Sequence, residues 1–246
     1  MKLNEHLEAS GNWLFRHRSR LPILVFCGII FTLADFSFPS GRHTMQEIWM
    51  LACLLVSAAG LGLRLFTVGH VPARTSSRNT ARQVADQVNT TGIYSVVRHP
   101  LYLGNYLMWL GAAATTRSPW FVTTMTLIFW LYHERIIYAE EAFLERTHGD
   151  AFREWAKRTP AFIPRPALWT PSALRFSLRH ATRREYLAAF GLVSAFAVLE
   201  HLEDWHGRGR FEFEPCWIWG WAVSFVVFVA IRIVTKQTRL LHVAGR

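Results

Sequence analysis

The sequence predicts an all-α fold, a polytopic membrane helix bundle of about six transmembrane helices with both termini on the cytoplasmic side. Of its 246 residues, 51% are hydrophobic and only 18% are charged, whereas a soluble domain has about 25% charged residues. Several apolar runs approach the length of about 20 residues that a helix needs to cross a bilayer. Positive charge is also unevenly distributed along the chain. We expect one membrane domain over residues 1–246.

Six apolar runs are the candidate spans, and they cover residues 21–38, 48–68, 101–116, 120–138, 187–199 and 216–234. The fifth run is the shortest, so a re-entrant or interfacial helix is the alternative for it. A further segment, residues 141–157, places aromatic residues among charges on both sides of Gly149. This pattern predicts a cytoplasmic interfacial helix, or two short helices that are broken at the glycine.

The basic residues predict how the helices are oriented. With six spans and the N-terminus inside, the outer loops hold only Arg42, Arg117, Arg208 and Arg210, which leaves 23 of the 27 Lys and Arg residues on the inner side. Cytoplasmic flanks are enriched in such residues. The net charge of +10 is therefore explained by membrane flanks in contact with anionic lipid. We expect an integral protein of the inner or endoplasmic reticulum membrane, with no nucleic-acid partner.

Two polar stretches flank the third and fourth runs, residues 92–104 and residues 140–149. The turn between the runs, Arg117 to Pro119, lies about 18 residues from Pro100, or roughly 27 Å of helix. The chain therefore crosses the membrane once and returns. Both stretches are expected to meet at the inner membrane surface.

The chemistry of these stretches suits a small zwitterion. Pro100 fits the first turn of a helix, whose free N–H groups and partial positive charge can hold an anion together with Arg98 and His99. Glu140 and Glu141 supply the opposite charge for an ammonium group. Because adjacent residues do not share a helix face, we expect one of these two to bind the ligand and the other to support it, through a pair with Arg98.

These residues form the pattern Gly-x-Tyr-x-x-x-Arg-His-Pro-x-Tyr-x-Gly from Gly92, followed by Glu-Glu-x-x-Leu and then Gly149 and Trp155. The pattern resembles the isoprenylcysteine carboxyl methyltransferase and phospholipid methyltransferase family of integral membrane enzymes. Ile93 stands where that family often has Pro, and Trp155 where it often has Tyr. The resemblance covers residues 88–166 as a catalytic core, with residues 167–246 as a C-terminal extension of two further helices.

The resemblance implies S-adenosyl-L-methionine as the cofactor and a lipid-embedded or small hydrophobic acceptor at the cytoplasmic face. The cofactor shell that it implies is Tyr94, His99, Pro100, Tyr102, Gly104, Glu140 and Glu141. The local chemistry adds Gly92 and Arg98 to this set. For the two glycines, close helix packing is an alternative, and for the two tyrosines a place in the aromatic belt. An NADPH-dependent reductase of the sterol-reductase type and a non-catalytic membrane scaffold are the rival functions.

Two more groups of polar residues allow alternative interpretations. His133, Glu134 and Arg135 fall slightly inside the membrane, where ionisable residues are functional by default. They are candidates to orient an anionic nucleophile, or they form a salt bridge at the helix end. If a base is needed, the candidates are His133, Glu134 or one of Glu140 and Glu141. The acidic and histidine residues between Glu200 and His206 include potential metal ligands, but their spacing is not diagnostic. Polar outer-loop residues are the favoured interpretation, and no metal is expected.

Overall fold

The computed structural model describes residues 3–18, 21–34, 43–72, 75, 85–208 and 214–246. These residues form helices and connecting segments, with one isolated β-bridge between Gly92 and Thr170. The helices are α1 (Leu3–His17), α2 (Leu21–Ala34), α3 (His43–Gly69), η1 (Ile93–Ser95), α4 (Pro100–Ala114), α5 (Pro119–His148), α6 (Asp150–Arg158), η2 (Pro166–Leu168), α7 (Leu178–Arg208) and α8 (Pro215–Gln237). The predicted all-helical class is therefore confirmed for the described residues.

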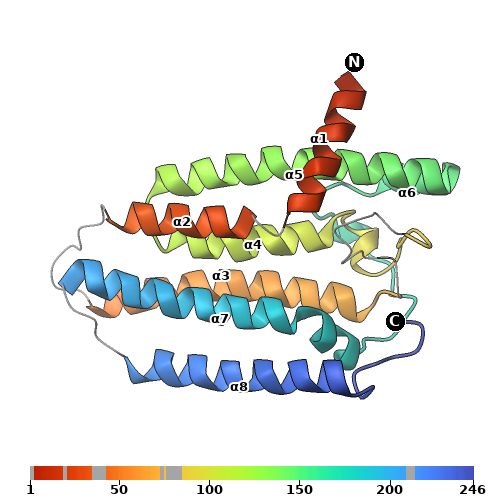
Figure 1. Ribbon diagram of the computed structural model, residues 1–246. Helices are drawn as coiled ribbons and strands as arrows, with labels where there is room; N and C mark the ends of the chain where they lie inside the picture. Colours follow the sequence, from red (N-terminus) through yellow and green to blue (C-terminus); the bar gives the residue numbers. More distant parts are fainter. Residues whose placement is uncertain (1–2, 19–20, 35–42, 73–74, 76–84, 209–213) are drawn as a thin grey trace.

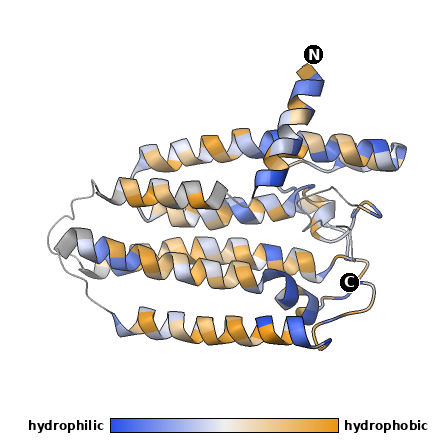
Figure 2. Cartoon of the chain, in the orientation of Figure 1, coloured by the Kyte–Doolittle hydropathy of each residue, from blue (hydrophilic) through white to orange (hydrophobic). Residues whose placement is uncertain are grey.

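The long helices lie side by side as an elongated bundle (Figure 1). Helix α3 packs against both α4 and α7, α8 packs on α7, and α1 crosses α5 at a steep angle. Apolar residues run along the lengths of the helices, whereas polar residues gather at their ends (Figure 2). This distribution is typical of helices that are surrounded by lipid.

Within the described residues, three helices are long and apolar enough to cross a membrane, at Met45–Gly69, Leu178–Trp205 and Pro215–Gln237. The predicted fifth run, residues 187–199, is short because polar residues at both of its ends belong to the same 31-residue helix, α7. Helices α2 and α4 have 14 and 15 residues. Helix α2 is described as far as Ala34, so the predicted end of the first span at residue 38 lies outside the described residues.

The predicted hairpin between the third and fourth runs is confirmed. Helix α4 begins at Pro100 and α5 at Pro119, each with the proline in its first turn. The Ser118 hydroxyl accepts a hydrogen bond from the Phe121 N–H at 3.3 Å and so caps α5. At its other end, α5 stops at Gly149, which has φ = 54°, and α6 follows directly. The break that was predicted at this glycine is therefore present.

Helices α3 and α4 pack at very short range. A Cβ atom added to Gly60 would lie 2.5 Å from the Gly104 carbonyl oxygen and 2.8 Å from the Met108 nitrogen. Gly111 likewise lies directly against the backbone of α3 at Cys53. Only glycine allows two backbones to approach this closely. We call this contact, formed by Gly60, Gly104 and Gly111, the glycine seam.

Helix α1 was not predicted, because its residues were interpreted as a basic flank. Its Gly11 lies against the backbone carbonyl of Arg135 on α5, and the Tyr132 hydroxyl donates to the Leu14 carbonyl at 2.9 Å. The Glu8 carboxylate is 2.6 Å from the Arg146 guanidinium, whose hydrogen bond lowers the pKa of Glu8. Helix α1 therefore covers α5 over a span of several turns.

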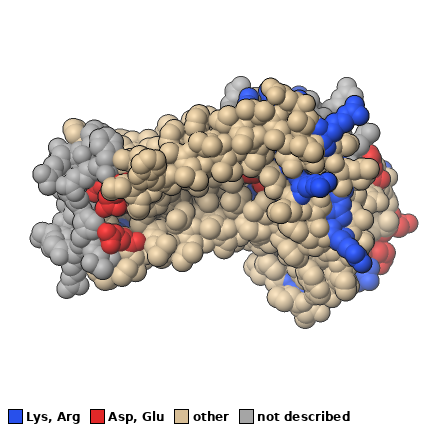
Figure 3. Space-filling model, turned by 90° about the horizontal axis from the view of Figure 1, so that it is seen from below, with Lys and Arg blue, Asp and Glu red and all other residues tan. Residues whose placement is uncertain are grey.

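Basic residues gather at one end of the bundle, where α3, α5 and α8 end (Figure 3). This grouping agrees with the predicted flanks. Of the four predicted outer-loop arginines, Arg42 and Arg210 lie outside the described residues. That the basic end faces the cytoplasm is a prediction that follows from the charge rule.

Candidate active site

The segment between α3 and α4 carries the first half of the predicted site. It begins at Gly92, whose N–H donates to the Thr170 carbonyl at 2.9 Å. Gly92 has φ = 62°, a conformation that favours glycine, and an added Cβ would collide with the Ser172 hydroxyl. The Ser95 hydroxyl donates to the Gly92 carbonyl at 2.7 Å and accepts from the Thr170 N–H at 2.9 Å. Gly92 thus fixes the loop, which is a structural use of this residue.

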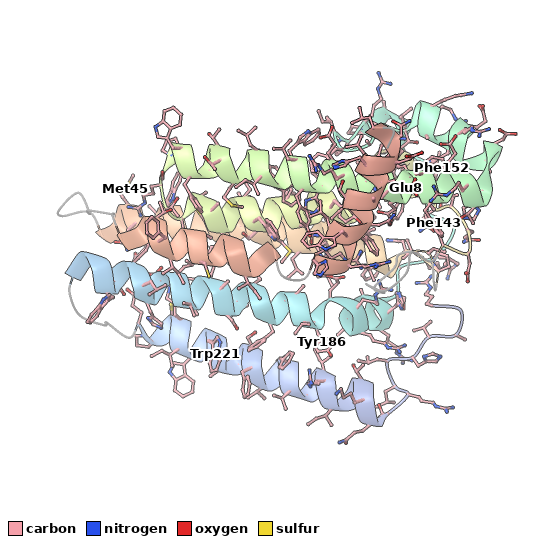
Figure 4. All side chains as sticks on the ribbon, turned by 45° about the horizontal axis from the view of Figure 1, so that its top comes forward. Glu8, Met45, Phe143, Phe152, Tyr186 and Trp221 are labelled. Atoms are coloured by element: carbon pink, nitrogen blue, oxygen red, sulfur yellow. The ribbon has the colours of Figure 1, made fainter. Side chains whose placement is uncertain are left out.

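The chain after α5 holds the same segment from the other side. The Trp155 indole donates to the Tyr94 carbonyl at 3.0 Å. The N–H groups of Arg98 and His99 donate to the Pro160 and Ala161 carbonyls at 2.9 and 3.2 Å. Trp155 is 7% exposed, and it lies on α6 together with the buried Phe152 (Figure 4). The amphipathic character that was predicted for this segment is therefore confirmed.

Five charged or polar side chains meet where α4 begins and α5 approaches its end. His99 Nε2 lies 2.8 Å from Glu141 Oε1, and Arg98 lies 3.2 Å from Glu141 Oε2. The Tyr102 hydroxyl donates to Glu140 Oε2 at 2.8 Å, and His99 Nδ1 is 3.9 Å from the same oxygen. His99 is only 6% exposed. We call these five residues, Arg98, His99, Tyr102, Glu140 and Glu141, the carboxylate cluster.

The cluster agrees with the predicted Arg98 pair and differs in one respect. The carboxylates of Glu140 and Glu141 both reach the segment 98–102, although the two side chains leave α5 in different directions. Their long side chains compensate for the about 100° between neighbouring positions on a helix. The cluster therefore contains two acidic groups in contact with the segment 98–102, rather than one.

The start of α4, where an anion site is predicted, has fewer free N–H groups than were expected. The N–H groups of Tyr102 and Leu103 both donate to the His99 carbonyl, each at 3.1 Å, and Pro100 has no N–H. The helix start is thus largely satisfied by its own backbone. The Arg98 guanidinium pairs with Glu141, and its Nε is buried and has no hydrogen-bond partner among the described residues.

Tyr94 lies beside the carboxylate cluster. Burial raises the pKa of its hydroxyl well above the usual range, and the nearby Glu140 carboxylate raises it further. A hydrogen bond with the Asn89 side chain acts in the opposite direction. Tyr94 is therefore a hydrogen-bond donor at neutral pH. Asn89 was not predicted, and nothing in its local sequence distinguishes it from an ordinary loop residue.

The structure separates the three residues that were predicted as catalytic candidates. His133 is buried at 6% exposure, with its ring 5.1 Å from that of Tyr102 and 3.8 Å from that of Phe129. Its Nδ1 lies 3.0 Å from the Phe129 carbonyl. In contrast, Glu134 and Arg135 are exposed, because the helix turns these two positions away from the cluster. Only His133 joins the candidate site.

Gly104 serves the glycine seam. An added Cβ would lie 2.5 Å from Arg64 Cγ on α3 and 2.8 Å from the Gly60 carbonyl oxygen. The packing alternative stated for this residue is therefore the one that the geometry favours.

Arg64 was not among the predicted residues. Its guanidinium donates to Glu185 Oε2 on α7 at 2.8 Å, to Glu185 Oε1 at 3.0 Å and to Asn105 Oδ1 on α4 at 2.5 Å. One arginine thus joins three helices, through a two-pronged ion pair and a further hydrogen bond. An arginine inside an apolar run was the available signal, since ionisable residues there usually have a defined role.

The acidic residues near the end of α7 differ from the prediction. Glu200, Glu203 and Asp204 are 4%, 2% and 2% exposed, so they are not the polar outer-loop residues that were expected. Gln46 on α3 donates to Glu203 at 3.2 Å. Among the described residues, no group of three or more His, Cys, Asp and Glu residues is arranged to hold a metal ion. The side chain of His206 lies outside the described residues.

The sequence of this chain is similar to those of several known proteins. The family model for phospholipid methyltransferases matches residues 48–151. The cobalt-zinc-cadmium resistance protein CzcN of Cupriavidus metallidurans is 33% identical over 76% of this chain and 85% of its own length. The chain belongs to the isoprenylcysteine carboxyl methyltransferase and phospholipid methyltransferase family.

Two further relatives differ in how much they share with the chain. The nickel-cobalt-cadmium resistance protein NccN of Alcaligenes xylosoxydans xylosoxydans is 32% identical over 64% of the chain and 70% of its own length. The protein-S-isoprenylcysteine O-methyltransferase of Schizosaccharomyces pombe is 36% identical over 30% of the chain and 32% of its own length. No solved structure matches the chain. The family match contains the whole carboxylate cluster and His133, and it also includes most of α3, with which the glycine seam begins.

Proposed function

We propose that the protein transfers a methyl group from S-adenosyl-L-methionine to a lipid-embedded or small hydrophobic acceptor at the cytoplasmic face of the membrane. Membership of a family of membrane methyltransferases supports the reaction class. The observation that carries the proposal is the carboxylate cluster, in which Glu140 and Glu141 lie within hydrogen-bond reach of Tyr102 and His99. The cluster lies where α4 begins, which is the end of the bundle at which basic residues gather (Figures 1 and 3).

The donor set of the cluster fits the amino-acid part of this cofactor. Two carboxylates suit an ammonium group, and the buried, unpartnered Nε of Arg98 suits a carboxylate. Glycine and proline at positions 92 and 100 shape the backbone around these groups. Tyr94 adds a hydroxyl that remains protonated at neutral pH. The residues present therefore match a zwitterion, as the sequence predicts.

Bound S-adenosyl-L-methionine supplies a methyl group that its sulfonium already activates. The protein has to align the acceptor and exclude water. Trp109 and Phe129 surround His133 with their rings at 6.3 and 3.8 Å, and the ring of Tyr106 lies 5.2 Å from that of Phe129. This aromatic wall leads away from the carboxylate cluster along α4 and α5, and it suits an apolar acceptor.

His133 is the candidate base. A carbonyl oxygen can only accept, so the contact with Phe129 assigns the ring proton to Nδ1. The neutral ring then has a lone pair on Nε2, which can take a proton from an amine or a thiol. A carboxylate or phosphate acceptor has no such need near pH 7. A transfer rate that depends on His133 therefore indicates an amine or thiol acceptor, and a rate that does not depend on it indicates a carboxylate or phosphate.

The named relatives are of two kinds, since some are protein-S-isoprenylcysteine O-methyltransferases and others are metal-resistance proteins. We infer for this chain only a membrane lipid, a lipidated molecule or a small hydrophobic acceptor. The family match favours methyl transfer over the NADPH-dependent reductase and over the non-catalytic scaffold.

The proposal is tested by calorimetry of the full-length protein in detergent with S-adenosyl-L-methionine, S-adenosylhomocysteine and NADPH. We expect the first two to bind and NADPH not to bind. Glu141→Gln and His99→Ala should each weaken cofactor binding by about tenfold or more. Glu154→Gln, on the exposed face of α6, is the matched control and should bind as the wild type does. Wild-type affinity in both cluster variants would contradict the assignment of the site.

A second experiment addresses the acceptor. Labelled methyl transfer into a total membrane lipid extract should mark one species, which is then identified. His133→Asn should retain cofactor binding and, for an amine or thiol acceptor, lose about a hundredfold in rate. A carboxylate or phosphate acceptor should show little change. Loss of cofactor binding in this variant would place His133 in the cofactor site instead.

A further inference from the structure

A cavity lies between the start of α7 and the end of α8. Its volume is about 420 Å³, which is within the range of small-molecule sites. The lining residues are Arg183, Thr235, Thr238, Arg239, Leu241 and His242. None of them belongs to the carboxylate cluster, and all of them lie outside the family match at residues 48–151.

The lining combines positive charge with hydrogen-bond donors. Arg183 and Arg239 come from segments that are more than 50 positions apart in the chain, and the fold brings both to one cavity. No described Asp or Glu is among the lining residues. Two guanidinium groups that face a shared space without a carboxylate between them favour an anion.

The orientation of His242 follows from its neighbour. Arg183 Nη1 lies 3.0 Å from His242 Nδ1, and a guanidinium can only donate. His242 Nδ1 therefore accepts, and the ring proton is on Nε2, where it is available as a donor. The hydroxyl of Thr235 is a further donor, because its oxygen is buried and makes no hydrogen bond with the described residues.

We propose that this cavity binds a phosphate group, held by Arg183 and Arg239 and by the donors of His242 and Thr235. A guanidinium matches the geometry of phosphate oxygens, and the fork of donors suits a tetrahedral anion. Helices α7 and α8 are both candidate membrane spans, so the cavity lies where a span meets the aqueous phase. The phosphate group can belong to an anionic phospholipid headgroup or to free phosphate.

This site is independent of the proposed methyl transfer. It predicts a binding event that is measured without cofactor and without acceptor, so its failure would leave the methyltransferase assignment intact. The competing explanation is general attraction of basic flanks to anionic lipid. Lys236 tests this explanation, because it lies on the last turn of α8, is exposed and does not line the cavity.

The experiment uses the full-length protein in a neutral detergent. One arm measures thermal unfolding with inorganic phosphate against chloride at the same ionic strength. The other arm measures binding of phosphatidylglycerol by native mass spectrometry, with diacylglycerol as the phosphate-free lipid. The variants are Arg183→Gln and Arg239→Gln, with Lys236→Gln as the matched control for loss of one charge. Unfolding temperatures without ligand report on the folding of each variant, and the exposed Arg239 provides the variant that is least expected to disturb the fold.

We expect each cavity variant to weaken binding by about tenfold or more, and Lys236→Gln to change it by less than about threefold. A response to inorganic phosphate assigns the site to free phosphate, and a response to phosphatidylglycerol alone assigns it to a lipid headgroup. The proposal is overturned if neither probe binds, if diacylglycerol binds as well as phosphatidylglycerol, or if Lys236→Gln weakens binding as much as the cavity variants do.

Discussion

The contacts that join α3 to α4 and α7 to α8 are built in opposite ways. Across the glycine seam, backbone touches backbone, and the space at Gly60 and Gly104 is too small for a methyl group. Between α7 and α8 the rings of Phe190 and Phe228 stack at 4.5 Å, with Tyr186 and Trp221 beside them (Figure 4). The seam lies inside the family match and supports the start of α4, where the site begins.

This difference predicts which contact tolerates change. A backbone contact cannot adjust when a side chain is added, whereas rings that are partly surrounded by lipid can repack. The ion pair of Arg64 with Glu185 is intermediate, since it joins the seam to α7 through side chains. Substitutions at these three contacts test whether the backbone contact is the least tolerant of the three.

The largest effect is expected at the seam. Gly60→Leu would place a side chain against the backbone of Gly104 and Met108, so we expect no folded protein in size-exclusion chromatography in detergent. Gly62→Leu is the matched control, because an added Cβ there meets no atom within 4 Å. A folded, active Gly60→Leu protein would show that the seam is looser than described.

A smaller effect is expected for the ion pair. Glu185→Ala leaves Arg64, which is 18% exposed, without its carboxylate partner, and should lower the free energy of unfolding by about 3 kcal/mol. Thermal unfolding in detergent measures the change. The double variant Arg64→Met with Glu185→Met should be closer to the wild type, because no unpaired charge remains. Equal losses in the single and double variants would argue that packing, and not charge, joins these helices.

The smallest effect is expected between α7 and α8. Phe228→Ala removes the ring that stacks on Phe190 and should cost about 1 kcal/mol of unfolding free energy. Val227→Ala, whose side chain is 49% exposed, is the control and should be neutral. If Phe228→Ala destabilises the protein as strongly as Glu185→Ala does, α8 is joined to the bundle more firmly than its exposed surface indicates.

Local signals in the sequence are sufficient to predict the hairpin and most of the site. Pro100 and Pro119 mark helix starts through a fixed φ angle and a missing donor, which are properties of the residue itself. Once both helices are placed, the known rise per residue sets their register. For this reason the sequence alone matches Glu140 and Glu141 with the segment around His99.

The remainder depends on contacts between residues that are distant in sequence. Arg64 pairs with Glu185, 121 positions later, and Gly11 lies against Arg135 on α5, and no local pattern signals either contact. The periodicity of α5 does not show which of His133, Glu134 and Arg135 faces α4, because one apolar helix in lipid has no unique inner face. The hydrogen bonds just before α4 also depend on tertiary geometry, since the carbonyls of Pro160 and Ala161 accept from the N–H groups of Arg98 and His99.

That last contact has a consequence for the order in which the protein is assembled. Protein chains grow from the N-terminus, and domains fold as they are made. The segment 92–99 is held by Trp155, Pro160, Ala161 and Thr170, which leave the ribosome only after the hairpin has been synthesised. Helices α4 and α5 can therefore insert and pair first. The segment 92–99 forms its hydrogen bonds only after the carbonyls of Pro160, Ala161 and Thr170 have been synthesised. We therefore expect the candidate site to form only after residues 155–170 have been synthesised.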